Sequence, residues 1–120
     1  MKLVSCVHHF FEQYLLRIKG YGPNTIKAYR DAFSLFLPFA RDTLGVPTNS
    51  LQLDQLTPEL IVDFLFWLEK ERGNSARTRN HRLAAIQSMA KMILYKHPEK
   101  RDIATRILNI PCKRYHRNII

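Results

Sequence analysis

The sequence predicts an all-α protein, folded as a compact bundle of four to five helices. Apolar residues recur at spacings of three and four through four long segments, and no segment alternates with period two for long enough to indicate a strand. Glycine and proline lie between these segments, where helices begin and end. The chain has 120 residues, of which 46% are hydrophobic, so it can bury the core of one domain.

The first two expected helices are separated by glycines. Residues 5–19 carry one apolar stripe, and Gly20 follows it. Pro23 suits the first turn of a second helix, whose apolar pattern predicts heavy burial. Pro38 interrupts that pattern and lacks a backbone N–H group, so we expect a kink or an early end there, followed by a connector over residues 41–56. The stripe of the first helix consists of Phe10, Phe11, Tyr14, Leu15 and Ile18.

Two further helices begin at favourable caps. Thr57 precedes Pro58 as an N-cap, and Ser75 has the same role before the fourth helix, which should end at His97. Apolar spacing favours a short fifth helix over residues 99–109. The buried stripe of the fourth helix is expected to be Leu83, Ile86, Ala90, Ile93 and Leu94. The opposite, exposed face is expected to be Arg77, His81, Ala84, Ala85 and Ser88.

The positive charge is confined to the last part of the chain. The formal net charge is +9, yet residues 1–72 hold eight basic and eight acidic residues. Residues 73–120 hold eleven basic residues against two acidic ones. Residues 42–71 contain six acidic residues and one lysine, giving −5. This polarity indicates one face for a polyanion, most often nucleic acid, and another face turned away from it.

The opening of the fourth helix holds the side-chain types that donate to phosphate oxygens and base edges. These residues are Ser75, Arg77, Thr78, Arg79, Asn80, His81 and Arg82. Three arginines with no acidic partner nearby in the sequence favour DNA binding, and a solvated basic face is the alternative interpretation. A weaker group of the same kind lies at the start of the second helix, where Asn24, Thr25, Lys27 and Arg30 could contact phosphates. A helix cap with ordinary surface charge explains that second group equally well.

These segments together resemble the N-terminal core-binding domain, also called the SAM-like domain, of tyrosine recombinases such as phage integrases and Xer-type enzymes. Residues 23–33, PNTIKAYRDAF, resemble the second helix of that domain. Residues 56–61 with Phe64 and Leu68 resemble its third helix. Further similarity lies in Ser75–Thr78, Asn80 and Arg82–Ile86, and in Ile110-Pro111 followed by Lys113-Arg114. Each motif is loose, but the series runs in order through nearly the whole chain.

The resemblance implies a helical bundle that clamps one side of a DNA duplex, with the second and fourth helices against the major groove. It implies DNA contacts by Thr25, Lys27, Arg30, Ser75, Arg77, Thr78, Arg79, Asn80 and Arg82. The first or fifth helix of the family often meets a neighbouring protomer, so the expected partners are double-stranded DNA and other recombinase protomers. Residues 1–110 would form the core-binding domain, and residues 111–120 a basic tail that begins a linker to an absent catalytic domain.

The resemblance also bears on catalysis. The family's chemistry belongs to a separate C-terminal domain with arginines, a His-x-x-Arg motif and a tyrosine nucleophile, and this sequence contains no His-x-x-Arg. Tyr115 lies among basic residues, but a phosphotyrosyl transfer needs several cations held on rigid elements. We therefore expect no catalysis by this chain and a DNA recombinase or integrase as its parent.

Other functions are less well supported by the sequence. The pairings of Cys6 with His8 and His9, and of Cys112 with His116, do not match compact zinc spacings, so no metal or other cofactor is expected. No apolar run approaches the ~18 residues of a membrane span, so we expect a cytoplasmic protein with neither a membrane nor a small-molecule partner. The alternative function is a helical protein–protein interaction module, whose basic face meets an acidic partner such as the −5 segment of a second copy.

Overall fold

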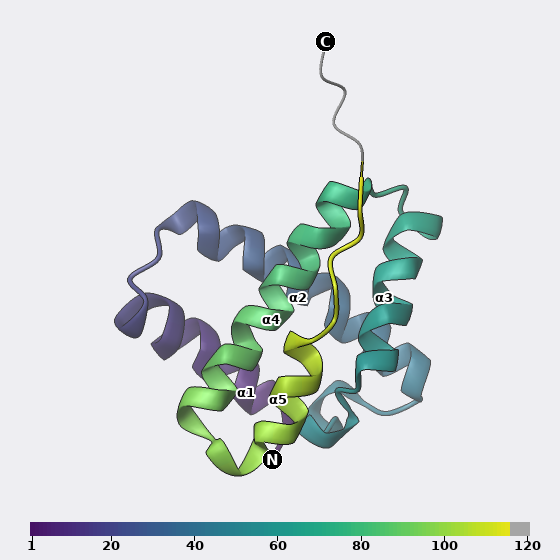
Figure 1. Cartoon of the computed structure of the whole chain (residues 1–120). Coiled ribbons are helices and arrows are strands. Elements are labelled where there is room, and N and C mark those ends of the chain that lie inside the picture. The colour runs from purple at the N-terminus through teal and green to yellow at the C-terminus, as the bar shows by residue number, and fades with distance from the viewer. Residues whose placement is uncertain (116–120) are drawn as a thin grey trace.

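The computed structural model describes residues 1–115 and consists of helices joined by short turns (Figure 1). Within that range the all-α prediction is confirmed: there are five α-helices and no strand beyond an isolated bridge between Lys2 and Gln52. The α-helices are α1 (Leu3–His9), α2 (Pro23–Leu44), α3 (Pro58–Glu71), α4 (Ala76–Lys96) and α5 (Arg101–Leu108). A π-helical segment, η1 (Phe10–Ile18), continues α1.

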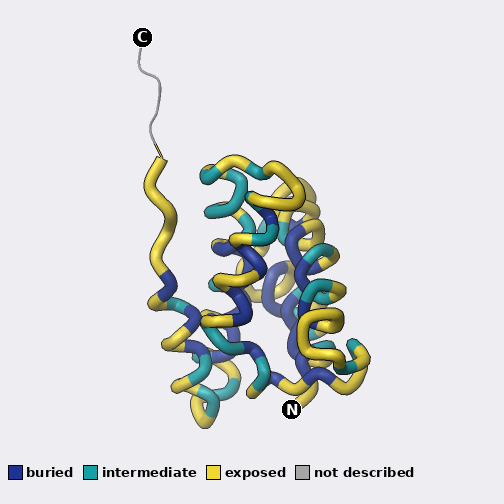
Figure 2. Tube along the Cα trace, turned by 90° about the vertical axis from the view of Figure 1, so that its right-hand side faces the viewer, coloured by how far each residue is buried: buried dark blue, intermediate teal, exposed yellow. Residues whose placement is uncertain are grey.

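Helix α4 lies at the centre of the bundle and packs against α1, α2, α3 and α5. The buried segments of the chain, dark blue in Figure 2, lie mainly towards the middle of the bundle. The buried residues of α4 are Leu83, Ala85, Ile86, Ser88, Met89, Ala90, Met92 and Ile93. The expected exposure of Ala85 and Ser88 is therefore wrong, because neighbours on several sides of α4 bury more than one stripe.

Helix α2 does not end at Pro38, contrary to the early end that was one of the two expected outcomes. It continues to Leu44, and Gly45 terminates it in the left-handed conformation at φ 65°. Pro38 removes the N–H group that would bond the carbonyl of Ser34. Since both residues are exposed, water can satisfy that carbonyl and the helix tolerates the proline.

The connector between α2 and α3 contributes to the core, which its irregular sequence did not predict. Leu51, Leu53 and Leu56 are each at most 2% exposed. The backbone N–H of Leu3 donates to the carbonyl of Leu51 at 2.9 Å, and the N–H of Leu53 donates to the carbonyl of Met1 at 2.9 Å. The connector is thus held against the start of the chain.

The first expected helix extends over α1 and η1, but its winding differs from the α-helical expectation. The N–H of Lys19 donates to the carbonyl of Tyr14, five residues earlier, at 2.8 Å. Phe10, Tyr14 and Leu15 face the core as predicted, whereas Ile18 is 50% exposed. The prediction for Ile18 was wrong because the wider π turn moves it away from the stripe.

The two predicted helix caps are confirmed. The Thr57 hydroxyl accepts a hydrogen bond from the N–H of Leu60 at 3.2 Å, and the Ser75 hydroxyl accepts one from the N–H of Thr78 at 3.2 Å. These caps begin α3 and α4 where the sequence placed them. Among residues 1–115, no helix combines the length and the apolar character that crossing a membrane requires.

Aromatic rings join α2 to α3. The Phe36 and Phe64 ring centroids lie 5.0 Å apart in an edge-to-face arrangement, and Phe39 lies 5.5 Å from Phe64 and 5.4 Å from Trp67. Phe64 is fully buried, whereas Phe66 on the same helix is 61% exposed. Phe64 and Phe66 therefore provide a matched test of core packing.

We expect Phe64→Ala to lower the free energy of unfolding by about 3–5 kcal/mol, because it leaves a cavity between α2 and α3. The control Phe66→Ala should change it by less than about 0.5 kcal/mol, since the ring is mostly in solvent. Urea denaturation followed by circular dichroism measures both values. Equal losses in the two variants would contradict the packing described above.

Candidate nucleic-acid interface

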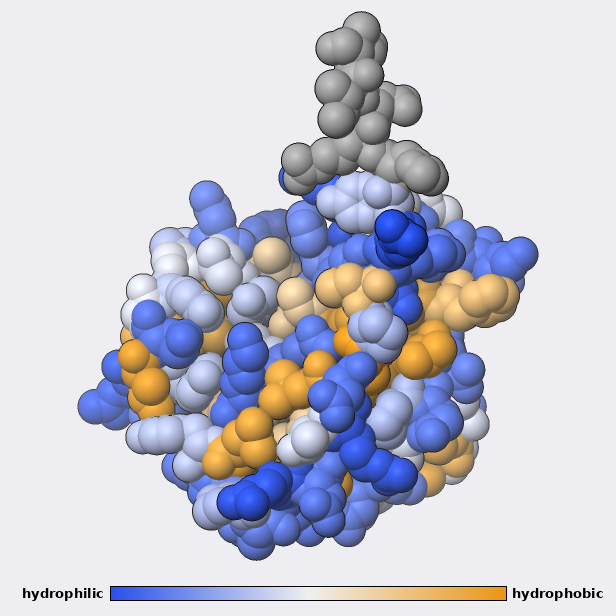
Figure 3. All heavy atoms as spheres, viewed as in Figure 1, coloured by the Kyte–Doolittle hydropathy of each residue, from blue (hydrophilic) through white to orange (hydrophobic). Residues whose placement is uncertain are grey.

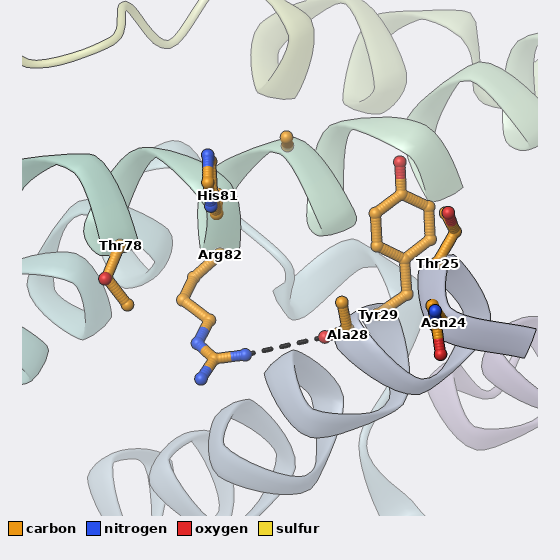
Figure 4. A pocket seen from close by; sticks show the side chains of 8 residues that line it. Asn24, Thr25, Ala28, Tyr29, Thr78, His81 and Arg82 are labelled. Carbon is orange, nitrogen blue, oxygen red and sulfur yellow. Dashed lines mark hydrogen bonds between the residues drawn. The ribbon is translucent and has the colours of Figure 1, made fainter.

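An open groove of about 480 Å³ separates the first turns of α2 from the first half of α4 (Figure 4). Each helix contributes four residues to it. The lining consists of Asn24, Thr25, Ala28 and Tyr29 from α2 and Thr78, His81, Arg82 and Ala84 from α4. The structure therefore joins the two sequence segments that the resemblance assigned to DNA.

The groove offers hydrogen-bond donors, and two of the residues that line it are small. Gly22, the residue before α2, has no side chain with which to cap the helix, so the backbone amides of Asn24 and Thr25 remain available for an anion. Ala28 and Ala84 are exposed and small. None of the residues that line the groove is acidic. A negatively charged, closely approaching surface fits this arrangement.

Arg82 extends from α4 across the groove to α2. Its Nη1 donates to the carbonyl of Ala28 at 3.5 Å, as the dashed line in Figure 4 marks. Its Nε is buried and has no hydrogen-bond partner among residues 1–115. The guanidinium is therefore half-buried at the contact of the two helices. Not all of its N–H groups have a hydrogen-bond acceptor in the described part of the chain.

Tyr29 forms the wall of the groove and was expected only as an apolar core residue. In Figure 4 its ring points towards α4. Partial burial raises the pKa of the Tyr29 phenol above its ordinary value, and the neighbouring Tyr21 raises it by a smaller amount. The hydroxyl therefore stays protonated at neutral pH and can donate or accept a hydrogen bond.

Five groove residues were absent from the nine predicted DNA contacts: Asn24, Ala28, Tyr29, His81 and Ala84. Helical spacing could have identified Ala28, Tyr29 and His81, because each lies three or four residues after Thr25 or Thr78 and so near the same helix face, and Ala84 lies three residues after His81. The list of predicted contacts followed the family resemblance, although His81 and Ala84 were expected on the exposed face of the fourth helix.

Two predicted residues of α2 lie outside the groove. Lys27 is exposed and its Nζ lies 3.5 Å from a carboxylate oxygen of Asp31, one turn further along the helix. The guanidinium of Arg30 lies 5.9 Å from the centre of the Phe11 ring and borders a different hollow, between α2 and α1. The structure thus does not bring Arg30 together with Thr25.

Two predicted residues of α4, Arg79 and Asn80, contact the chain after α5. Arg79 Nη1 donates to the carbonyl of Pro111 at 3.4 Å, and its Nε lies 3.9 Å from a carboxylate oxygen of Glu69. Asn80 makes two hydrogen bonds with the backbone of Lys113: its Oδ1 accepts from the N–H at 2.8 Å, and its Nδ2 donates to the carbonyl at 2.8 Å.

The expectation that no acidic residue pairs with the arginines is therefore wrong for Arg79. Glu69 lies ten residues earlier, on α3, and the packing of α3 against α4 brings the two side chains together. The Arg79 side chain is 11% exposed. The Arg79 guanidinium is therefore largely used in contacts with Glu69 and Pro111 within the protein.

Residues 110–115, which we call the C-terminal segment, run alongside α4 towards its N-terminus (Figure 1). Gln87 Nε2 donates to the carbonyls of Ile107 at 3.2 Å and Ile110 at 2.9 Å, which fixes the turn into the segment. Lys113 Nζ lies 2.8 Å from the Glu69 carboxylate. Figure 3 shows that hydrophilic residues predominate where α4 begins and this segment passes, above a hydrophobic band over α4 and α5.

A second hollow, of about 440 Å³, lies between the start of α4 and the C-terminal segment. It is lined by Arg77, Asn80, His81, Cys112, Lys113, Arg114 and Tyr115. His81 lines both this hollow and the α2/α4 groove, so the two are neighbours. Arg77 and Arg114 are exposed.

The cysteines and histidines are not grouped as metal ligands. Across residues 1–115 no cluster of three His, Cys, Asp or Glu side chains could hold an ion, and His116 lies outside the described residues. Burial raises the pKa of the Cys6 thiol, so that residue stays protonated at neutral pH.

Comparison with known proteins identifies the family. Residues 9–96 match the family described as "Phage integrase, N-terminal SAM-like domain". Over 118 residues the chain is 37% identical to "Putative integrase/recombinase y4rC" of Sinorhizobium fredii, and over 114 residues it is 36% identical to "Putative integrase/recombinase y4rD" of the same strain. These alignments cover 98% and 95% of this chain. No solved structure matches it significantly.

The fold and the family match together define an integrase N-terminal domain. The chain belongs to the phage integrase N-terminal SAM-like domain family, which is part of the tyrosine recombinases. It spans 36% of the length of y4rC and 41% of the length of y4rD.

The arginines of α4 should differ in their effect on stability. We expect Arg79→Ala to lower the free energy of unfolding by about 1–2 kcal/mol, because it removes hydrogen bonds of a mostly buried guanidinium. Arg77→Ala, at an exposed position two residues earlier, should change it by less than about 0.5 kcal/mol. Chemical denaturation without DNA measures the difference, and an unaffected Arg79→Ala would show that its contacts contribute nothing net.

Proposed function

We propose that this chain binds double-stranded DNA as the non-catalytic core-binding domain of a site-specific tyrosine recombinase or integrase. The observation that carries the proposal is the α2/α4 groove. It combines the free amides of one helix N-terminus, small residues for close approach and the half-buried Arg82, and no acidic residue lines it. Membership of the integrase family supports the same ligand.

The dimensions and the charge of this face suit a DNA major groove. A major groove of about 12 Å width admits one α-helix. The exposed ridge of α4, with Arg77, His81 and Ala84, can enter it while Thr25 and the amides of α2 meet a flanking phosphate. The whole charge excess of +9 lies after residue 72, on α4 and the chain that follows. Electrostatic attraction would therefore orient this face towards DNA.

Seven of the nine candidate residues divide into groups with different roles in this proposal, and the other two, Arg79 and Asn80, hold the C-terminal segment. Thr25, Arg77, Thr78 and Arg82 lie in or beside the groove and are assigned direct contacts. Lys27 is exposed on α2 and is assigned a phosphate contact at the rim, and Ser75 caps the helix that carries the other residues. Arg30, on the far side of α2, would need DNA to wrap beyond the groove.

We further propose that phosphoryl transfer belongs to another part of the parent protein. In the described chain Tyr115 lies in an extended segment and is 43% exposed, without the rigid set of cations that such a reaction needs. The chain alone should bind DNA without cutting it. A DNA ligand also supports a cytoplasmic location in a prokaryotic cell.

The groove assignment predicts that an acidic residue placed there will repel DNA. Ala84→Glu should weaken binding to a fluorescent duplex at least tenfold at 0.1 M salt, because it adds a negative charge at the point of closest approach. The control Thr105→Glu makes the same charge change at an exposed position on α5 and should change affinity much less. Equal effects of the two variants would show that only net charge matters and would reject the groove.

An exposed apolar patch on α3 supports self-association of protomers. Val62 and Phe66, one turn apart on this helix, are 43% and 61% exposed, and the acidic Glu59 and Asp63 lie beside them. An apolar patch with acidic neighbours can meet the basic face of a second copy. This arrangement also supports the alternative of a protein-interaction module.

Sedimentation without DNA tests this association. We expect a dimer at low salt that dissociates at high salt, because charge attraction between the copies is screened. Phe66→Ala should weaken the dimer through loss of apolar contact. A monomer at every salt concentration would contradict self-association of the free chain and leave DNA binding unaffected.

A further inference from the structure

The C-terminal segment is held against α4 by side chains of α3 and α4, two of which the family resemblance assigns to DNA. We call Glu69, Arg79, Asn80 and Gln87 the clasp. These four residues make hydrogen bonds or ion pairs with residues 107–113, at distances between 2.8 and 3.4 Å. Asn80 satisfies both backbone groups of Lys113, which is a sequence-independent way to fix a chain position.

The clasp determines where the next basic residue lies. Lys113 is paired with Glu69, so its charge is partly neutralised. Arg114 follows it directly, is exposed, and lines the second hollow with Arg77 and His81. None of the residues that line this hollow is acidic. Two guanidinium groups and an imidazole, from α4 and from the C-terminal segment, thus share one concave surface.

We infer that this hollow is a second phosphate-binding site, formed by Arg77, His81 and Arg114, and that Asn80 is the positioning residue that assembles it. The ligand is a phosphodiester group of the DNA backbone, next to the stretch that enters the α2/α4 groove. The inference rests on the proposed function, because the ligand is the same duplex. It gives Asn80 a role different from the direct DNA contact that the family resemblance implies.

The clasp itself can be tested without DNA. In the wild-type chain the Lys113 amide donates to Asn80, so its hydrogen exchange should be slowed relative to an unstructured peptide. Asn80→Ala should return that exchange towards the unprotected rate while the amides of buried α4 residues keep their protection. Unprotected exchange of the Lys113 amide in the wild type would overturn the clasp, and loss of protection throughout α4 would show that Asn80 supports the fold in general.

Affinity for a duplex then separates positioning from direct contact. Arg114→Ala should lose one phosphate contact, which lowers the slope of log K against log salt by about 0.9 and weakens binding roughly tenfold at 0.1 M salt. Asn80→Ala leaves the net charge unchanged and should nevertheless cause a similar loss. The double variant should bind no more weakly than Arg114→Ala alone, because both changes remove the same contact.

The remaining outcomes are equally decisive. If the two losses multiply in the double variant, Asn80 contacts DNA independently and its positioning role is rejected. If Arg114→Ala binds like the wild type, the second site is rejected while the proposed function stands. If the wild type binds no duplex at all, the proposed function fails and the second site fails with it. Lys96→Ala is the control: it removes an exposed charge from α4 about 28 Å from Arg77 along the axis and should leave the salt slope nearly unchanged.

Discussion

Burial of α4 against its neighbours is the constraint on which the rest of this structure depends. A helix packed against α1, α2, α3 and α5 has only a narrow strip of surface left for a ligand. On α4 this strip includes the side with Arg77, His81 and Ala84, and the groove between α2 and α4 lies along it. The position of the candidate interface is therefore a consequence of core packing.

The same constraint explains why polar residues of α4 take different roles. Residues adjacent in sequence point about 100° apart on a helix, so Arg77, Arg79 and Arg82 face three surroundings. Arg77 faces solvent, Arg79 faces α3 and the C-terminal segment, and Arg82 faces α2. A cluster of arginines that looks uniform in the sequence is thus divided between binding and structure.

Much of the fold was predictable because local physical chemistry determines it. The caps Thr57 and Ser75 and the apolar stripes of α3 and α4 all express preferences of a few neighbouring residues. Predictions failed where the outcome depended on distant contacts. Ser88 is buried because other helices surround α4, and α2 continues past Pro38 at a position where Pro38 and Ser34 are both exposed.

The sequence by itself determined the helical class, the approximate helix ends, the family resemblance and the fact that the excess charge follows residue 72. Each of these follows from residue type and short spacing. Only the tertiary structure decided which basic side chains are available to a ligand. That choice depends on Glu69 reaching Arg79 from another helix and on Asn80 binding the backbone of Lys113, 33 residues further along the chain. Contacts between such distant residues are set by helix packing, and no local pattern in the sequence records them.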